Sequence, residues 1–147
     1  MEKVIFIGKT GCGKTTLCQK LNELQVKYKK TQAVEIYDNA IDTPGEYLEN
    51  RNYYSALIMS SIDACVIALV ADVTEEECYF PPQFAMTFTK PVIGVLTKMS
   101  LAPNEEHVAY LEKRLMEAGV SQIFKIDTLT EYNLHSLKMY LDQFIDL

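Results

Sequence analysis

Eight consecutive residues near the start of the chain have the types and spacing of a phosphate-binding loop. The segment is Gly8-Lys9-Thr10-Gly11-Cys12-Gly13-Lys14-Thr15, which matches G-x-x-x-x-G-K-[ST] at every fixed position. Its glycines let successive backbone N–H groups turn toward phosphate oxygens, and a helix that begins there adds the positive partial charge of its N-terminus. We expect the run from Gly8 to Thr16 to contact a nucleotide. Lys14 and Thr15 are the expected catalytic residues, Lys14 on the β- and γ-phosphates and Thr15 on Mg²⁺.

A second segment with chemical potential is Asp42-Thr43-Pro44-Gly45, which fits D-x-x-G after a short apolar run. The same tetrapeptide is also an ordinary turn, so on its own it indicates little. Beside a phosphate-binding strand, it predicts that Asp42 contacts Mg²⁺ directly or through water, and that the Gly45 N–H approaches the γ-phosphate. Glu46 follows, and its carboxylate is either a base in the reaction or a solvent-facing group.

These motifs require elements that hold them at one edge of a sheet. Continuous apolar runs predict buried strands, and shorter extended segments add to them, at 4–7, 33–37, 40–42, 64–70, 92–96 and 122–126. Apolar spacing of three or four residues predicts helices with one buried side at Leu17, Leu21 and Leu24; Tyr54, Leu57 and Ile58; Val108, Leu111 and Leu115; and Leu134, Leu137, Leu141 and Phe144. We predict a single α/β domain over 1–147 with the three-layer P-loop NTPase fold. Its mostly parallel sheet would have about six strands, with helices on both faces.

Composition and charge disfavour several classes of partner. The 147 residues include 14 Lys+Arg and 20 Asp+Glu, a net charge of −6. We therefore expect no nucleic-acid or anionic-membrane partner, because both need a basic face. The longest apolar stretch, 64–71, is less than half of the roughly 20 residues that a membrane span requires. The chain has no signal-peptide features and its four cysteines form no CxxC pair, so we expect a cytoplasmic protein. The acidic run at 75–77 is expected to be a solvated connection.

Together these residues resemble the translation-factor-related P-loop GTPases and, more narrowly, the ethanolamine- and propanediol-utilisation family (EutP/PduV) encoded with bacterial microcompartments. The narrower resemblance covers nearly the whole chain. It rests on the short N-terminus that leads into Ile5-Phe6-Ile7-Gly8, on residues 42–47 and on residues 90–98. It implies a Ras-like sheet, nucleoside-triphosphate binding and a role in ethanolamine or propanediol breakdown. Some family members are assigned acetate kinase activity, and others resemble GTPase-like factors that act at the shell.

The same resemblance implies roles for residues that follow later strands. Thr97-Lys98-Met99-Ser100 stands where guanine-binding proteins carry N/T-K-x-D, so Thr97 and Lys98 are expected to contact the nucleotide. Ser100 replaces the aspartate that accepts from guanine, and losing hydrogen bonds to a charged acceptor costs about 1.5–3 kcal/mol, or about 10- to 100-fold in affinity. ATP is therefore favoured over GTP. Asp127 either supplies the missing acceptor from the next loop or is a helix-capping or solvated residue. Thr31, in the polar connection after the first helix, is the candidate switch threonine on Mg²⁺.

Two functions remain open, and both rest on Mg²⁺-dependent binding of ATP or GTP. In the first, the protein is an enzyme that transfers the γ-phosphoryl group to acetate, as the resemblance suggests, although no acetate-binding motif is recognisable. In the second, it is a slow GTPase-like switch or adaptor that docks on a microcompartment shell protein when its loops change with the nucleotide. A scaffold that binds no nucleotide is a third interpretation, and the intact phosphate-binding loop argues against it.

Overall fold

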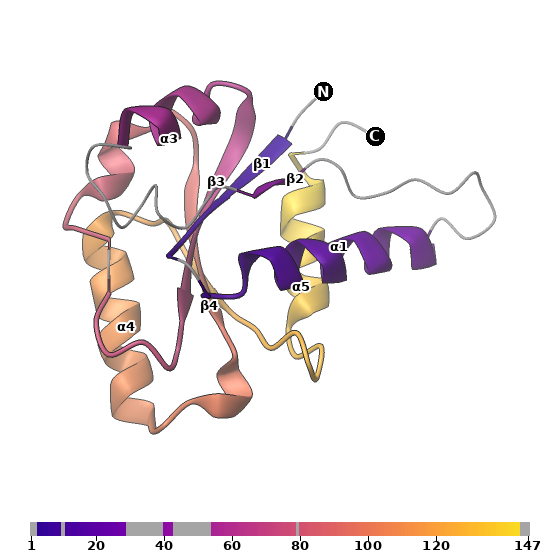
Figure 1. Ribbon diagram of the computed structural model, residues 1–147, viewed down its shortest axis with the longest axis vertical. Coiled ribbons are helices and arrows are strands. Elements are labelled where there is room, and N and C mark those ends of the chain that lie inside the picture. The colour runs from indigo at the N-terminus through magenta and orange to yellow at the C-terminus, as the bar shows by residue number, and fades with distance from the viewer. Residues whose placement is uncertain (1–2, 10, 29–39, 43–53, 79, 145–147) are drawn as a thin grey trace.

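The computed structural model describes residues 3–9, 11–28, 40–42, 54–78 and 80–144. Five strands form one sheet in the order β2-β1-β3-β4-β5, and all neighbouring pairs are parallel (Figure 1). Their bounds are β1 Lys3–Ile7, β2 Ala40–Asp42, β3 Ala64–Asp72, β4 Val92–Thr97 and β5 Ile123–Lys125. The predicted α/β class and parallel sheet are confirmed. The described residues contain five of the six expected strands, and the expected segment at 33–37 lies outside them.

Helices connect the strands and cover both faces of the sheet. On one face lie α1 (Lys14–Tyr28) and α5 (Leu134–Asp142), and on the other lie α3 (Tyr54–Ser61) and α4 (Glu105–Ala118) (Figure 1). Two short 3-10 helices, η2 (Phe84–Thr87) and η3 (Met99–Leu101), lie in the connections around β4. This is the predicted three-layer arrangement. In the part of the chain that the structure describes, no helix is long and apolar enough to cross a membrane.

The strands contribute alternate residues to two separate cores. In β1, Val4 and Phe6 pack in the core beneath α1 and α5, whereas Ile5 and Ile7 pack in the core beneath α3 and α4. All four side chains are fully buried. A strand covered on both faces has no solvent side to carry polar residues, which explains the continuous apolar runs in the sequence.

Among the helix residues whose burial the structure describes, two depart from the predicted spacing. Ile58 is 41% exposed, because the short α3 turns Leu57 and Ser61, four positions apart, toward the interior. Phe144 lies beyond the end of α5, although it still packs against the core. The predicted end of α4 at Gly119 is confirmed, since this residue has φ 103°, a left-handed conformation that favours glycine.

Because the strands are parallel, their carboxyl ends and the loops that follow lie at one edge of the sheet, the usual place for ligands in α/β folds. Asp42, the last residue of β2, pairs in register with Phe6 of β1. Asp72, the last residue of β3, stands opposite Thr97, the last residue of β4. The fold therefore gathers the ends of strands that carry the sequence motifs.

Candidate functional site

The loop between β1 and α1 has the tight backbone that its glycines allow. Gly11 and Gly13 have φ values of 84° and 98°, in the left-handed region that glycine adopts without a Cβ penalty. Gly8 has a different requirement. A Cβ built there would lie 2.5 Å from the Val70 carbonyl oxygen and 2.6 Å from Cys12 Sγ. The backbone can therefore lie this close to β3 only if residue 8 has no side chain.

Lys14 is the first residue of α1 and is almost fully buried within this loop. Its Nζ donates to the Gly8 carbonyl at 2.6 Å and to the Lys9 carbonyl at 3.3 Å, and it lies 3.8 Å from Cys12 Sγ. These contacts direct the ammonium group into the turn of the loop. Beside it is a cavity of about 270 Å³ lined by Gly11, Gly13, Lys14, Thr15, Thr16 and Lys98. The cavity has the donors that a chain of phosphate groups requires.

The end of β4 supports the phosphate-binding loop from the adjacent side. The Thr97 hydroxyl, which is buried, donates to the Cys12 carbonyl oxygen at 2.7 Å. The Lys98 ammonium donates to the Gly11 carbonyl oxygen at 3.1 Å. The segment that the sequence assigns to base recognition therefore also fixes the backbone of the loop.

Asp72 completes this arrangement, although it belongs to none of the sequence motifs. Its Oδ2 atom lies 2.7 Å from Lys98 Nζ, and its Oδ1 atom accepts from both the backbone N–H and the hydroxyl of Thr74, each at 2.7 Å. Burial acts to raise the pKa of this carboxyl, but the hydrogen bonds from Lys98 and Thr74 outweigh it and hold the pKa below its usual value. The sequence does contain a signal for this residue: Asp72 is the acidic end of an otherwise apolar strand, and β1 and β4 on either side of that strand lead into the motifs.

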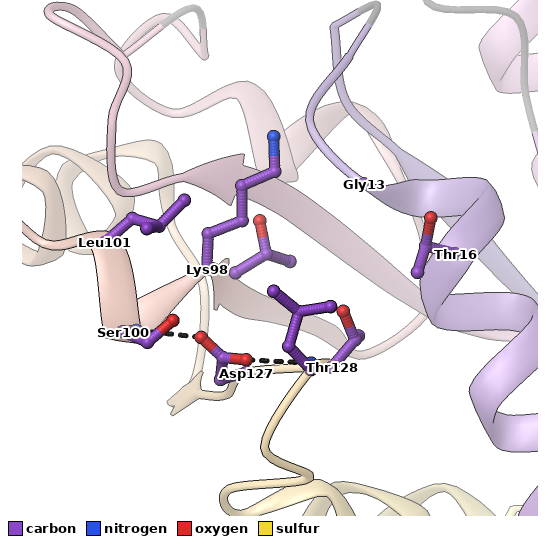
Figure 2. Close-up of a pocket in the computed structure, with 9 residues that line it drawn as sticks. Gly13, Thr16, Lys98, Ser100, Leu101, Asp127 and Thr128 are labelled. Atoms are coloured by element: carbon purple, nitrogen blue, oxygen red, sulfur yellow. Dashed lines mark hydrogen bonds between the residues drawn. The ribbon is translucent and has the colours of Figure 1, made fainter.

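The loops after β4 and β5 enclose a second cavity of about 220 Å³, which also borders the first turn of α1 (Figure 2). It is lined by Gly13, Thr16, Thr97, Lys98, Ser100, Leu101, Asp127, Thr128 and Leu129. Asp127 is 1% exposed, and its Oδ2 atom accepts from the Ser100 backbone N–H at 2.8 Å. Of the alternatives left open for Asp127, the solvated one is therefore wrong, because backbone donors of two loops surround the carboxylate.

The acidic run after β3 is also less solvated than expected. Glu76 and Glu77 are exposed, but Glu75 is buried, and its Oε2 atom accepts from the Asp72 backbone N–H. Burial raises the pKa of the Glu75 carboxyl above its usual value. The Glu75 carbonyl oxygen lies 2.6 Å from Nε2 of His107 on α4. Glu75 therefore packs against the body of the protein, beside Lys9 and Gly11 of the phosphate-binding loop.

The residues expected to bind Mg²⁺ are compatible with such an ion. Thr15, the second residue of α1, lines the cavity of about 270 Å³ beside Lys14, and Asp42 ends the strand beside β1. Mg²⁺ in nucleotide sites is typically held by one or two side-chain oxygens together with phosphate oxygens and water. A threonine in the first turn of α1 and an aspartate that ends β2 are residue types of that donor set.

Comparison with known proteins identifies the family. A family model described as ethanolamine utilisation and propanediol utilisation, PduV-EutP, matches residues 1–143. The chain belongs to this family. The propanediol utilization protein PduV of Citrobacter freundii is 37% identical over 142 residues, which cover 97% of this chain and 94% of that protein. The probable acetate kinase EutP of Escherichia coli strain K12 is 32% identical over 144 residues, 96% of this chain and 89% of that protein.

Solved structures support the P-loop GTPase fold of this PduV-EutP member. The elongation factor SelB of Methanococcus maripaludis superposes with a TM-score of 0.65 at 22% identity, covering 97% of this chain and 32% of SelB. Era of Aquifex aeolicus, solved with GDP and AlF4⁻, gives a TM-score of 0.65 at 20% identity, covering all of this chain and 58% of Era. The chain thus spans about a third of SelB and somewhat over half of Era, and the likeness shows the fold.

Most residues that the sequence assigns to the site lie together in this PduV-EutP structure. Around the two cavities or in the loop between them are Gly8, Lys9, Gly11, Cys12, Gly13, Lys14, Thr15, Thr16, Thr97 and Lys98. Asp42 is placed by its backbone at the end of β2. Thr10, Thr31, Gly45 and Glu46 lie outside the described residues, so their roles stay predictions.

Proposed function

We propose that this PduV-EutP protein binds a nucleoside triphosphate with Mg²⁺, favours ATP over GTP, and transfers the γ-phosphoryl group to acetate. The observation that carries the proposal is the buried Lys14, whose ammonium points into a glycine-shaped loop at the start of α1. A helix N-terminus, a lysine and oriented backbone N–H groups together favour a polyphosphate. They supply a local positive site in a chain of net charge −6.

The preference for ATP follows from the donors and acceptors of the second cavity, of about 220 Å³, which we call the base-side cavity. Guanine has an N1–H and a 2-amino group that need an acceptor, and adenine has neither. Ser100 offers a hydroxyl at the place of the guanine-reading aspartate, and the Asp127 carboxylate already accepts three backbone N–H groups. Each unpaired donor that becomes buried costs about 1–3 kcal/mol. Guanine therefore loses more than adenine in this cavity.

The transfer step needs little covalent chemistry from the protein. An acetate oxygen attacks the γ-phosphorus, the bond from that phosphorus to the β,γ-bridging oxygen breaks, and ADP and acetyl phosphate leave. Mg²⁺, when bound, would offset charge on the phosphate oxygens. Lys14 and the loop N–H groups would hold the phosphates in line and stabilise their charge. Acetate carries no proton to remove, so Glu46 would serve only hydrolysis. The relatives named probable acetate kinase support this choice of acceptor.

Calorimetry and a product assay test the proposal together. We expect MgATP to bind wild type at least tenfold more tightly than MgGTP, and Lys14→Ala to lose both. Lys113→Ala, which removes an exposed lysine of α4, is the matched control and should bind as wild type does. Acetyl phosphate should form from ATP and acetate with wild type and not with Lys14→Ala. No binding below millimolar concentration would contradict nucleotide binding.

The same assays separate the enzyme from the switch. Tight binding without acetyl phosphate would remove the kinase activity. Nucleotide-dependent binding to a purified microcompartment shell protein would then support a GTPase-like switch or adaptor in its place.

A further inference from the structure

Asp127 joins the two loops that form the base-side cavity. Its Oδ2 atom accepts from the Ser100 N–H, in the loop after β4, at 2.8 Å. Its Oδ1 atom accepts from the Leu129 and Thr130 N–H groups, in its own loop, at 2.8 and 3.1 Å. The Asp127 backbone N–H donates to the Tyr132 carbonyl at 3.1 Å. One carboxylate thus determines the position of both walls of the cavity.

The carboxylate is committed to this role. A carboxylate has about four acceptor positions, and three of them are occupied by backbone N–H groups. The residue as a whole is 1% exposed. Hydrogen bonds from Ser100, Thr130 and Leu129 outweigh the effect of burial and lower the pKa of the carboxyl, so it is ionised at neutral pH. A negative charge therefore lies at the wall of the cavity next to position 100.

That charge has a consequence for the residue at position 100. An aspartate there would place a second carboxylate close to the first, because its own backbone N–H is the group that Asp127 holds. Two carboxylates at such a distance repel each other, and one of them becomes difficult to ionise. Serine at position 100 and aspartate at position 127 are therefore a matched pair.

We propose that Asp127 is a positioning residue that sets base selectivity. It tethers the loops after β4 and β5 to each other, and its negative charge disfavours a guanine-reading carboxylate at position 100. This inference rests on the proposed binding of nucleotide and extends it to selectivity. Base preference then depends on the two positions jointly, and neither substitution alone converts it.

A double-mutant cycle tests the pair. The ratio of Kd values for MgATP and MgGTP is measured in wild type, Ser100→Asp, Asp127→Ser and the double variant. We expect the double variant to shift the ratio toward GTP by at least tenfold. Ser100→Asp alone should shift it less than threefold, because the new carboxylate meets Asp127. Equal effects of Ser100→Asp in both backgrounds would overturn the proposal.

Two further measurements keep the tether testable if no variant binds nucleotide. Amide hydrogen exchange of the ligand-free protein should be at least tenfold faster at Ser100, Leu129 and Thr130 in Asp127→Ser than in wild type. Unchanged exchange would overturn the tether, whereas absent binding in wild type would overturn only the proposed function. Glu131→Gln, an exposed change in the same loop, is the control and should alter neither exchange nor the ratio.

Discussion

The ammonium group of Lys98 lies 2.7 Å from the Oδ2 atom of Asp72, so that an ion pair spans the carboxyl ends of β3 and β4. The same ammonium donates to the Gly11 carbonyl oxygen at 3.1 Å. The Asp72 side chain is 6% exposed and that of Lys98 is 37% exposed, so the pair is shielded mainly on the carboxylate side. Asp72 therefore acts on the phosphate-binding loop through Lys98.

Replacing Asp72 with asparagine should weaken nucleotide binding without changing base preference. The amide keeps the shape and can still accept from Thr74, but Lys98 loses its charged partner. We expect three- to tenfold weaker binding of both MgATP and MgGTP by calorimetry. The free energy of unfolding in urea should fall by about 1–2 kcal/mol. This is less than the loss expected on breaking a fully buried charged pair, because Lys98 is partly solvated. Asp142→Asn removes a comparable ion pair to Lys138 on α5 and should leave binding intact. Unchanged binding in Asp72→Asn would contradict the role of this pair.

Thr97→Val should loosen the phosphate-binding loop from the sheet. Valine keeps the volume of threonine but removes the hydroxyl that donates to the Cys12 carbonyl at 2.7 Å. The Cys12 carbonyl oxygen is then buried without its donor. We therefore expect a loss of about 1–3 kcal/mol in unfolding free energy and several-fold weaker nucleotide binding. Thr97→Ser keeps the hydroxyl and is the matched variant. If both variants bind alike, the hydroxyl does not position the loop.

Leu101 and Leu129 are 56% and 81% exposed, and both line the base-side cavity. Their placement is explained if they contact the flat faces of a bound base. Each change to serine should weaken MgATP and MgGTP binding three- to tenfold at an unchanged ratio. The thermal midpoint should hardly move, because substitutions of exposed residues usually change stability by less than about 0.5 kcal/mol. Met139→Ser, at a 71% exposed position on α5, is the control. A drop in stability with no change in affinity would argue against contact with the base.

The parts of the molecule that the sequence predicts well are those whose cause is local. β3 has no polar residue before Asp72 because both of its faces are covered, and this pattern is readable in the sequence alone. The phosphate-binding loop is a single run of residues, so its glycines and Lys14 report its conformation directly. α4 is likewise bounded by Asn104 and Gly119, which are ordinary helix-ending residues.

The contacts that assemble the site join distant positions, and no local pattern reports them. Lys98 meets Gly11 across 87 positions, and Thr97 meets Cys12 across 85. Asp72 and Asp127 acquire their roles only when four parallel strands place their ends together. The same limit explains the error at Glu75, since an acidic run reads as solvated unless a buried backbone N–H beneath it is known.

Gly8→Ala should prevent the loop from forming in its present position. The added Cβ would lie 2.5 Å from the Val70 carbonyl oxygen, a backbone atom of β3 that cannot move aside independently. We expect a large loss of unfolding free energy, about 2–4 kcal/mol, which is in the range of other steric errors in a buried site. Gly11→Ala provides a contrast, because it strains φ but meets no atom within 4 Å, and it should cost less, about 1 kcal/mol. Urea denaturation of both variants measures the difference, and equal losses would contradict the steric account.

Glu75→Gln should stabilise the protein at neutral pH. Burial raises the folded-state pKa of this carboxyl above the unfolded value of about 4.3, so the folded protein binds more protons between the two values. Wild-type stability is therefore reduced as pH rises through the folded pKa. Glutamine has no charge to desolvate, and its side-chain oxygen can still accept from the Asp72 N–H.

Urea unfolding of wild type and Glu75→Gln between pH 4 and pH 8 measures this effect as a difference. The variant should be more stable at pH 7, and its advantage should shrink toward pH 4, where the wild-type carboxyl is mostly protonated in both states. The lowered pKa values of Asp72 and Asp127 are present in both proteins, so their contributions largely cancel. Glu76→Gln changes an exposed neighbour and should show no such trend. An advantage that is independent of pH would mean that desolvation of the Glu75 charge is not its source.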